Sequence, residues 1–552
     1  MKNFYCLLLC LTFWGVQAQV KDDLYDLKFR RWTSMDFPWS VVQFVSGEGG
    51  CVCFADSLNP VNGAFPLSFR SREIEPGSRF YFHFLAGLSQ QMYLPGDYRQ
   101  LTFELTARGR DIRRGWLKVT GRDAEENLLR KDSVEIVGNG EWNKCMLKLP
   151  AREVRFCGVE ICAEGGDDWQ KASVFNLGCM RILGDDKEID WSGATTALQD
   201  QDLEYSGPWP GSVVAEVKNK RIVALAETVH GYASIGEAET ALADLLIDGG
   251  GCRLVLLELP YDLGLMYNLY IQGNTGISEE EIKGYMEKTL FRPDPFLAFL
   301  NKVRAYNRLH AEKVYVIGID RMTWETVYLR RFLACASGKG DDGWYKNWMK
   351  LIREGNIGEA RRELSGNKAL LQGWEEMDVY WLNQALKQLS VQEENRRVAV
   401  GMLGGRDRIM KENIIGWVDS LLPADKQALI IGHWCHFNKV NTIIPVSEES
   451  AGYYLNQRYG DDYHVIGILA GEGELWGPRW GTKKAVPYPL ECPTGEEFLE
   501  NRCRHTWHFP VAGRCRIPER VGWIRLSGSY ASRIFYVPVV LSRRMDGFLW
   551  VK

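Results

Sequence analysis

Short stretches of alternating apolar and polar residues fill the chain from about residue 20 to residue 190. Clear examples are residues 101–107, 115–120 and 155–161, with turn sequences rich in Gly, Pro and Asn between them. Alternation with a period of two predicts strands that bury one face and expose the other. Many short strands joined by turns are typical of two packed antiparallel sheets. We therefore predict an all-β sandwich, jelly-roll-like, over residues 19–190.

The pattern changes near residue 195, where continuous apolar runs replace the alternation. Strands that are buried on both faces have such runs, and helical sequence lies between them. Strands that alternate with helices indicate an α/β domain. We predict this domain over residues 195–552, with a mostly parallel sheet and flanking helices. The apolar runs are residues 222–226, 254–257, 314–319, 428–431 and 465–469.

Two helical features of this second domain can be placed. Residues about 322–425 hold more helix than one crossover between strands requires, so we predict an insertion that forms a helical cap over the sheet. After the first apolar run, residues at helical spacing predict one buried stripe. The stripe consists of Ile235, Ala238, Leu242, Leu245 and Leu246.

The N-terminus has the features of a signal peptide. Lys2 precedes a mostly apolar run over residues 5–16, and the small residues Val16 and Ala18 fit the cleavage rule. We predict a signal peptide over residues 1–18 and an exported protein that resides in the periplasm or outside the cell. No later stretch reaches about 18 uninterrupted apolar residues, so we predict no membrane-spanning helix.

The composition narrows the function classes. The 552 residues are 45% hydrophobic and 25% charged, as is usual for globular proteins, and the formal net charge is only −4. This balance offers no basic surface for a nucleic acid, so we expect none as a partner. The chain has 20 Trp, and exposed aromatic rings stack on sugars. Glycan binding by the sandwich and a plain spacer role are both open alternatives.

Residues able to do acid–base chemistry follow several of the predicted buried strands. In open α/β sheets ligands bind outside the carboxyl ends of the strands, so side chains at four such ends are expected to share one cleft. A lone histidine in a core more often just satisfies a hydrogen bond. The chain has only eight His, however, and three of them lie at these strand ends. The residues are Glu227, His230, Glu258, Asp320, His433 and His436.

Pairing is expected because an isolated carboxylate or imidazole beside such apolar runs is costly to bury. Other catalytic signatures are absent from the sequence. There is no G-x-S-x-G nucleophile elbow, no Walker A loop, no G-x-G-x-x-G and no H-E-x-x-H. A serine hydrolase, a nucleotide-binding protein or a zincin is therefore not indicated.

Several short motifs resemble those of the erythromycin esterase-like family, in the order of the family, over about residues 200–552. Two positions depart from it: Trp434 replaces an Asn, and Glu239 stands where the family has an Arg. The motifs are E-T-V-H-G at Glu227 to Gly231, L-E at Leu257 and Glu258, N-L-Y at Asn268 to Tyr270, R-D-R-I-M-K-E-N at Arg406 to Asn413, and H-W-C-H at His433 to His436.

The resemblance implies hydrolysis of a small-molecule ester or lactone by activated water, without a covalent intermediate. We expect no cofactor. In this hypothesis His230 is the general base, and Glu227 or Glu258 orients its ring. His433 or His436 would donate to the developing oxyanion. The residues expected to bind substrate or to support the site are Arg406, Asn268, Tyr270, Asp320 and Glu239.

Three alternatives use the same residues. His230, His433, His436 and Glu258 are an acceptable set of ligands for a divalent metal ion, which would make the protein a metal-dependent hydrolase. Glu227 and Glu258 could instead be the carboxylate pair of a glycoside hydrolase. The charge reversal at Glu239 suggests a third alternative, a non-catalytic binding protein on the same fold.

Overall fold

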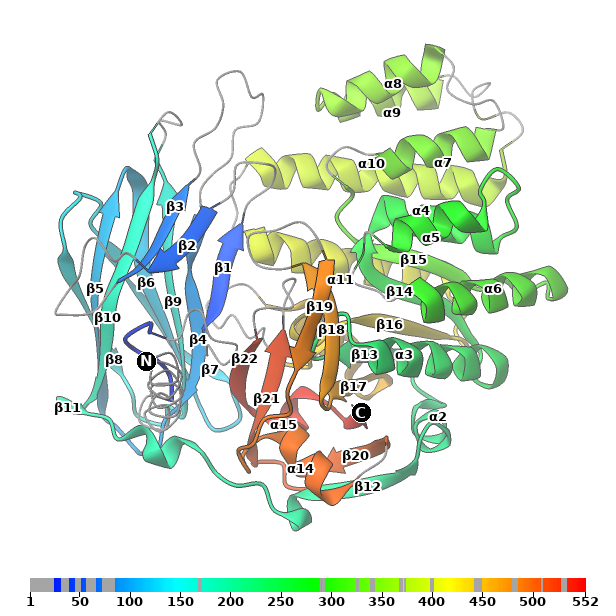
Figure 1. Cartoon of the computed structure of the whole chain (residues 1–552). Helices are drawn as coiled ribbons and strands as arrows, with labels where there is room; N and C mark the ends of the chain where they lie inside the picture. Colours follow the sequence, from blue (N-terminus) through cyan, green and yellow to red (C-terminus); the bar gives the residue numbers. More distant parts are fainter. Residues whose placement is uncertain are drawn as a thin grey trace, which may run out of the picture.

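A computed structural model describes most of the chain from residue 24 onward (Figure 1). The predicted signal peptide, residues 1–18, lies outside the described residues. The described ranges are 24–30, 39–44, 51–55, 66–71, 85–166, 171–287, 289, 293–323, 327–337, 343–366, 371, 374–397, 402–440, 449–478, 485–507, 510–527 and 534–552.

The N-terminal part consists of two antiparallel sheets, as the period-two alternation predicts. One sheet has the strand order β1-β4-β9-β6-β7 and the other β2-β3-β10-β5-β8, with β11 paired to β10. In β8, Cys145, Leu147 and Leu149 are buried while their neighbours are exposed, so alternate residues build the core between the sheets. The bounds are β1 (Ser40–Phe44), β2 (Cys51–Ala55), β3 (Leu67–Ser71), β4 (Leu85–Tyr93), β5 (Gln100–Arg110), β6 (Ile112–Arg122), β7 (Leu128–Ile136), β8 (Asn143–Pro150), β9 (Phe156–Gly165), β10 (Val174–Gly184) and β11 (Lys187–Glu188).

The C-terminal part is built on an eight-stranded sheet of order β12-β20-β23-β17-β13-β16-β14-β15. The strands from β23 to β15 pair in parallel, whereas β20 pairs antiparallel with both β23 and β12. The sheet is therefore mixed, because β20 runs antiparallel to both of its neighbours. The bounds are β12 (Leu203–Pro208), β13 (Ile222–Glu227), β14 (Cys252–Pro260), β15 (Tyr315–Asp320), β16 (Gln427–His433), β17 (Tyr463–Ala470), β20 (Val511–Cys515) and β23 (Gly547–Val551).

Helices pack against this sheet and make the C-terminal part an α/β structure. Helix α3 packs on β17 and β23, α4 on β14 and β15, α11 on β15, and α13 on β17. The bounds are α2 (Gly211–Val217), α3 (Ala233–Leu245), α4 (Tyr261–Ile271), α5 (Glu279–Met286), α6 (Pro293–Leu309), α7 (Val327–Ser337), α8 (Gly343–Arg353), α9 (Ile357–Gly366), α10 (Glu376–Arg397), α11 (Met402–Leu421), α12 (Trp434–Phe437), α13 (Ala451–Tyr459), α14 (Leu499–Thr506) and α15 (Leu541–Arg544).

One residue of the predicted stripe on α3 is not buried. Ile235, Ala238, Leu242 and Leu246 lie in the core, but Leu245 is 40% exposed. At 100° per residue Leu245 lies about 80° around the helix axis from Ile235, at the edge of the buried face. The spacing of the apolar residues therefore predicts the helix correctly, but Leu245 does not belong to its buried face.

The predicted insertion at about 322–425 contains α7, α8, α9, α10 and α11. Helices α8 and α9 lie farthest from the eight-stranded sheet (Figure 1). Helix α11, in contrast, packs directly on β15 and on α13. The last part of this insertion therefore belongs to the layer that covers the sheet, and only its outer helices stand away from it.

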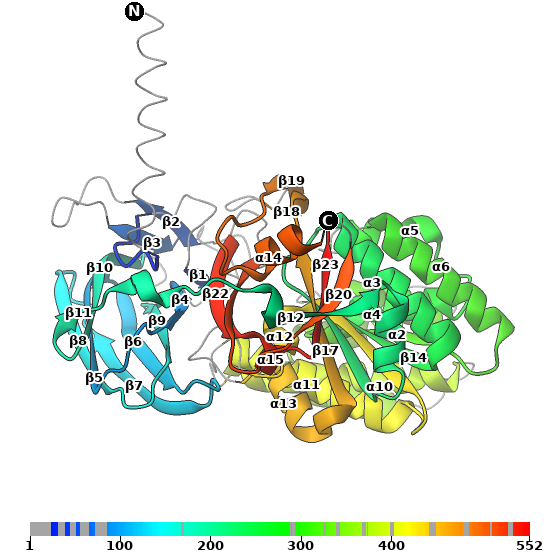
Figure 2. The ribbon, with the colours of Figure 1, turned by 90° about the horizontal axis from the view of Figure 1, so that it is seen from below.

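Two hairpins complete the C-terminal part, and one of them joins it to the sandwich. The hairpins pair β18 (Gly473–Pro478) with β19 (Ala485–Leu490), and β21 (Val521–Ser527) with β22 (Ile534–Val540). The β21–β22 hairpin lies between the sandwich and the large sheet in both views (Figures 1 and 2). Trp523 of β21 stacks on Tyr25 at a ring distance of 5.7 Å. Within the described ranges no helix is both long and apolar enough to cross a membrane.

Candidate functional site

His230 and Glu227 form an ion pair at the end of β13. The chain turns sharply after β13, because Thr228 bonds to the carbonyl of Ile468 through both its backbone N–H and its hydroxyl, each at 3.0 Å. This turn brings the Nδ1 atom of His230 to 2.7 Å from Oε1 of Glu227. The His230 side chain is 13% exposed. Nδ1 therefore donates to Glu227, and Nε2 has no hydrogen-bond partner within the described part of the chain.

Gly231 is required by the same turn. Its φ is +75°, and a Cβ atom on it would lie 2.0 Å from the carbonyl oxygen of Trp476. The backbone N–H of Trp476 donates to the Gly231 carbonyl at 3.0 Å. Only glycine adopts this backbone conformation in so little space. The backbone conformation and the lack of space explain why a glycine follows His230 in the motif.

The electric fields around His230 favour its charged form. Burial alone would lower the pKa of His230, but the Glu227 carboxylate and the more distant Glu258 raise it above 6.5. An imidazole whose charged form is stabilised by a carboxylate at Nδ1 can take up a proton at Nε2 during a reaction. The contact of His230 with Glu227 therefore fits the general-base role predicted for this residue.

Arg406 binds two carboxylates from two neighbouring strands. Its Nη2 donates to Oε1 of Glu258 at 2.6 Å and its Nε donates to Oδ2 of Asp320 at 2.8 Å. Burial would raise the pKa of Glu258, but His436 and Arg406 hold it well below its usual range. Glu258 is therefore ionised, and Arg406 ties α11 to the ends of β14 and β15.

His433 is held in its neutral form by contacts to both ring nitrogens. Nε2 donates to the carbonyl of Ser527 at 2.8 Å, and Nδ1 accepts from the N–H of Cys435 at 3.3 Å. Burial first, and then the charge of His230, lowers the pKa of His433 well below its usual value. Its backbone N–H donates to Oε2 of Glu258 at 2.5 Å. Glycine is needed at position 432, where a Cβ would lie 2.9 Å from that oxygen.

His436 is also committed to protein partners. Its Nδ1 lies 3.0 Å from Oδ1 of Asp407, and its Nε2 lies 2.7 Å from Nη1 of Arg406 and 3.5 Å from Glu258. Burial would lower its pKa, but Asp407, Cys435 and Glu258 raise it well above its usual value. Neither His433 nor His436 presents a free ring N–H in this arrangement. The geometry does not favour the oxyanion role predicted for them.

The five residues predicted as catalytic nevertheless lie in one cluster. The ring centroids of His230 and His433 are 4.6 Å apart, and those of His433 and His436 are 6.5 Å apart. Glu258 joins the cluster through the backbone of His433 and through Arg406. The sequence did not single out Ser527 and Cys435, which fix the His433 ring; Ser527 lies 94 residues away and no motif marks it.

The other predicted supporting residues lie in different surroundings. The Tyr270 hydroxyl lies 2.5 Å from Oδ1 of Asn301 and 3.1 Å from Oε2 of Glu279, so it connects α4 with α6 and α5. Asn268 is buried on α4, and its Oδ1 has no partner among the described residues. Glu239 is buried on α3 close to Glu227. Burial, and then the charge of Glu227, raises the pKa of Glu239 well above its usual value.

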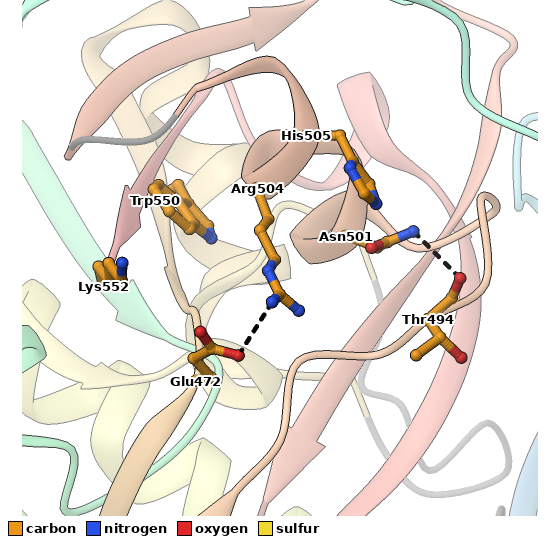
Figure 3. Close-up of a pocket in the computed structure, with 7 residues that line it drawn as sticks. All are labelled: Glu472, Thr494, Asn501, Arg504, His505, Trp550 and Lys552. Carbon is orange, nitrogen blue, oxygen red and sulfur yellow. Dashed lines mark hydrogen bonds and ion pairs between the residues drawn. The ribbon is translucent and has the colours of Figure 1, made fainter.

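A cavity of about 530 Å³ lies at the carboxyl ends of β17 and β23, on the edge of the sheet where β13 also ends (Figure 3). The segment that follows His230 borders it. The Tyr232 hydroxyl donates to the carbonyl of Glu472 and the Ser234 hydroxyl to that of Lys552, each at 2.7 Å. Four residues span at most about 14 Å, which limits the distance between His230 and Ser234. None of the five residues predicted as catalytic lines the cavity. Its lining residues are Glu472, Thr494, Asn501, Arg504, His505, Trp550 and Lys552.

The lining of this cavity is polar and mixed in charge. Arg504 and Glu472 form an ion pair at 3.3 Å. Trp550 is 1% exposed, and its Nε1 has no hydrogen-bond partner in the described structure. As for a metal ion, no three His, Cys, Asp or Glu residues within the described ranges are arranged to hold one.

The chain matches the model of one known protein family. A family model described as erythromycin esterase matches residues 247–552. Glu258, Arg406, His433 and His436 lie inside this range, whereas Glu227 and His230 precede it. None of the curated proteins matches the chain.

Solved structures similar to the two parts of the chain have low identity. A Bacillus cereus protein is 17% identical, with a TM-score of 0.49, and the match covers 65% of this chain and 94% of that one. A mutant of the erythromycin esterase EreC in its open conformation is 16% identical, with a TM-score of 0.44, over 61% and 92% of the two chains. TmCBM61 in complex with β-1,4-galactotriose is 18% identical, with a TM-score of 0.21, over 29% and 97%.

Proposed function

The chain belongs to the erythromycin esterase family, and from this premise we propose that it is a hydrolase that cleaves a carboxylic ester or a lactone with water activated by His230. The pair of Glu227 and His230 is the observation that supports this proposal, since Nε2 of the ring has no partner among the described residues. The proposed substrate is a small molecule, since the cavity bordered by Tyr232 and Ser234 has a volume of about 530 Å³.

In the proposed reaction, Nε2 of His230 removes a proton from water while the water oxygen attacks the carbonyl carbon of the substrate. Glu227 accepts the hydrogen bond from Nδ1 throughout and stabilises the imidazolium that forms. The imidazolium then gives its proton to the oxygen of the departing alcohol. One water is consumed, and an acid and an alcohol are released. No covalent enzyme intermediate is needed.

The remaining residues of the cluster keep the site in place. The ionised Glu258 and Arg406 connect β14, β15 and α11, and Glu258 receives the backbone N–H of His433. These contacts hold the backbone of His433 in place, and its ring lies 4.6 Å from the ring of His230. Substitution of such a supporting residue is expected to lower the rate by displacing the catalytic groups, since a displacement of about 1 Å is enough to slow a reaction.

The glycoside hydrolase alternative is less well supported by this geometry. A glycosidase needs one carboxyl group that stays protonated near neutral pH. The pKa of Glu258 is held far below its usual range by His436 and Arg406 against the effect of burial. The other carboxylate of that pair, Glu227, binds Nδ1 of His230.

Hydrolysis of a panel of aryl esters, alkyl esters and lactones tests the proposed function. Products are identified by mass spectrometry as acid and alcohol, before and after dialysis against a chelator. Turnover that survives chelation supports activation of water by His230 alone. Turnover that is lost with the chelator and restored by a divalent metal ion would favour the metal-dependent alternative, and ligand binding without turnover would favour a binding protein.

Export and glycan binding by the sandwich are further proposals. They rest on the sequence features of residues 1–18 and on the aromatic content of the chain. N-terminal sequencing of protein secreted by the native host tests cleavage after Ala18. Retention of the full chain on immobilised polysaccharides, compared with a column without glycan, tests the second proposal.

A further inference from the structure

A glutamate of the sandwich is completely buried in the C-terminal part of the chain. Glu126 lies in the turn between β6 and β7, and its side chain is 0% exposed; that of Arg544 in α15 is 1% exposed. The two residues are 418 positions apart. Nη2 of Arg544 contacts Oε2 of Glu126, and its Nε donates to the same oxygen at 3.0 Å.

Further hydrogen bonds fix this carboxylate at the junction of the two parts. Oε1 of Glu126 accepts the backbone N–H of Val540 at 2.7 Å. Gln91 of β4 donates to Oε2 at 3.3 Å and to the carbonyl of Pro538 at 2.9 Å. Residues 538 and 540 belong to β22, which packs beside β4. The sandwich is therefore attached through a buried charge in one defined register, and not only through apolar contacts.

Removal of one partner of such a pair leaves the other charge buried without compensation. Contacts between domains of one chain are usually modest and polar, and they permit relative motion. A completely desolvated ion pair with a full set of hydrogen bonds resists that motion, because any displacement separates the charges in a medium of low dielectric constant. The junction around Glu126 is therefore expected to be rigid.

Arg544 extends the contact from the junction to the histidine cluster. Its Nη1 donates to Oδ1 of Asn438 at 3.0 Å, and its guanidinium lies 5.6 Å from the ring centroid of Trp434. Asn438 in turn donates through Nδ2 to the carbonyl of Trp434 at 3.0 Å. These contacts surround α12, the four-residue helix that carries His436 and begins next to His433.

We propose that Glu126 is a positioning residue for the histidine cluster. The sandwich would then contribute to hydrolysis by keeping the histidines in place. Glu126 holds Arg544, Arg544 holds Asn438 and covers Trp434, and these two residues hold α12 against Glu258 and His230. The kinetic part of this inference rests on the proposed function, whereas its structural part does not.

Hydrogen exchange followed by mass spectrometry tests the structural part on the full chain. Glu126→Gln keeps the shape of the side chain and removes its charge. The matched control is Glu164→Gln, which removes the partner of Arg114 in an exposed pair of the same sandwich sheet. We expect Glu126→Gln to speed exchange in residues 433–440 and 541–546 by about tenfold or more, because local opening governs exchange. Glu164→Gln should leave both segments unchanged.

A second variant covers the case in which Glu126→Gln fails to fold. Asn438→Ala leaves the junction intact and interrupts the contact farther along, so it should speed exchange in residues 433–440 alone. Unchanged exchange in this segment for a folded Glu126→Gln or for Asn438→Ala would overturn the proposal.

The kinetic readout uses an ester that the wild-type protein hydrolyses. We expect kcat to fall by about tenfold or more in Glu126→Gln with little change in KM, since misplacement of a catalytic group lowers the rate by up to about 10²-fold. An unchanged kcat would contradict the positioning role. If the wild-type protein hydrolyses no ester, the proposed function fails, while the exchange experiment still decides whether Glu126 orders α12.

Discussion

Arg406 donates to Glu258 over 2.6 Å and to Asp320 over 2.8 Å, and so connects a helix with two strand ends. The pair with Glu258 is well shielded, since the carboxylate side chain is 6% exposed. Removing a buried partner typically costs about 3–5 kcal/mol, whereas an exposed pair contributes about 0–1 kcal/mol. The Arg406–Glu258 contact is thus expected to matter for the stability of the site region.

Substitution of Arg406 by Ala tests this expectation. Two carboxylates lose their partner, so we expect a loss of about 3 kcal/mol in the free energy of unfolding, measured by urea denaturation. Arg408 serves as control, because it lies on the same helix and its pair with Glu412 is about half exposed at 3.7 Å. Arg408→Ala should cost less than about 1 kcal/mol. Equal losses in the two variants would contradict a special role of the buried pair.

The pair of His230 and Glu227 predicts a shift in the pH dependence of hydrolysis. The base form of His230 increases as pH rises through its pKa, which Glu227 raises above 6.5 against the effect of burial. In Glu227→Gln this stabilisation of the imidazolium is lost, so the pKa falls. The acid limb of kcat/KM should move to lower pH while the maximum rate decreases. If the acid limb of kcat/KM stays at the same pH in Glu227→Gln, Glu227 does not influence the pKa of the group that titrates.

Glu239 gives a prediction for stability. Burial and the charge of Glu227 raise its folded pKa well above the ordinary value of 4.5. A carboxyl with a raised folded pKa stabilises the fold fully below its unfolded pKa, and this stability is lost as pH rises toward the folded pKa. Glu239→Gln, which cannot ionise, should therefore have a higher thermal midpoint than the wild type at pH 8, and the difference should shrink at pH 4.

The control for this experiment is Glu237→Gln on the exposed side of the same helix. Its midpoint should follow that of the wild type at both pH values. A Glu239→Gln variant that is less stable than the wild type at pH 8 would mean that the Glu239 carboxylate is ionised and paired in the folded protein.

Substitution by alanine is expected to have opposite effects on stability at Gly231 and at Gly416. A Cβ at Gly231 would lie 2.0 Å from the Trp476 oxygen, and its φ of +75° disfavours alanine. A Cβ at Gly416, within α11, would meet no atom within 4 Å. Gly231→Ala should destabilise the protein by more than about 1 kcal/mol, while Gly416→Ala should stabilise it by about 0.5–1 kcal/mol. Thermal unfolding of both variants checks the two signs.

Much of the layout could be predicted from local sequence pattern. Continuous apolar runs at 222–226 and 428–431 became β13 and β16, neighbours in the parallel part of the sheet, with Glu227 beside His433 in register. Parallel strands place their carboxyl ends at one edge, so the meeting of Glu227, His230, Glu258 and His433 follows from the pattern. The antiparallel return of β20 leaves no such mark, and the sheet is mixed for that reason.

The details that decide chemical roles could not be predicted in this way. The geometry does not favour the predicted oxyanion role of His433, because the carbonyl of Ser527 and the N–H of Cys435 contact its two ring nitrogens. A carbonyl contact from a residue 94 positions away has no signal in composition or spacing. The same holds for Glu126 and Arg544, whose contact depends on how the sandwich lies against the β21–β22 hairpin.

The most direct test of the account is the rate of ester hydrolysis by His230→Ala beside that by His310→Ala. His310 lies just past the end of α6, exposed and stacked on Tyr306 at 3.9 Å, so its substitution removes an imidazole far from the proposed chemistry. We predict that kcat/KM falls by at least about 10²-fold in His230→Ala, as is typical for loss of a general base, with the thermal midpoint little changed and His310→Ala fully active. A folded His230→Ala variant with the wild-type rate would contradict the assignment of His230 as the base.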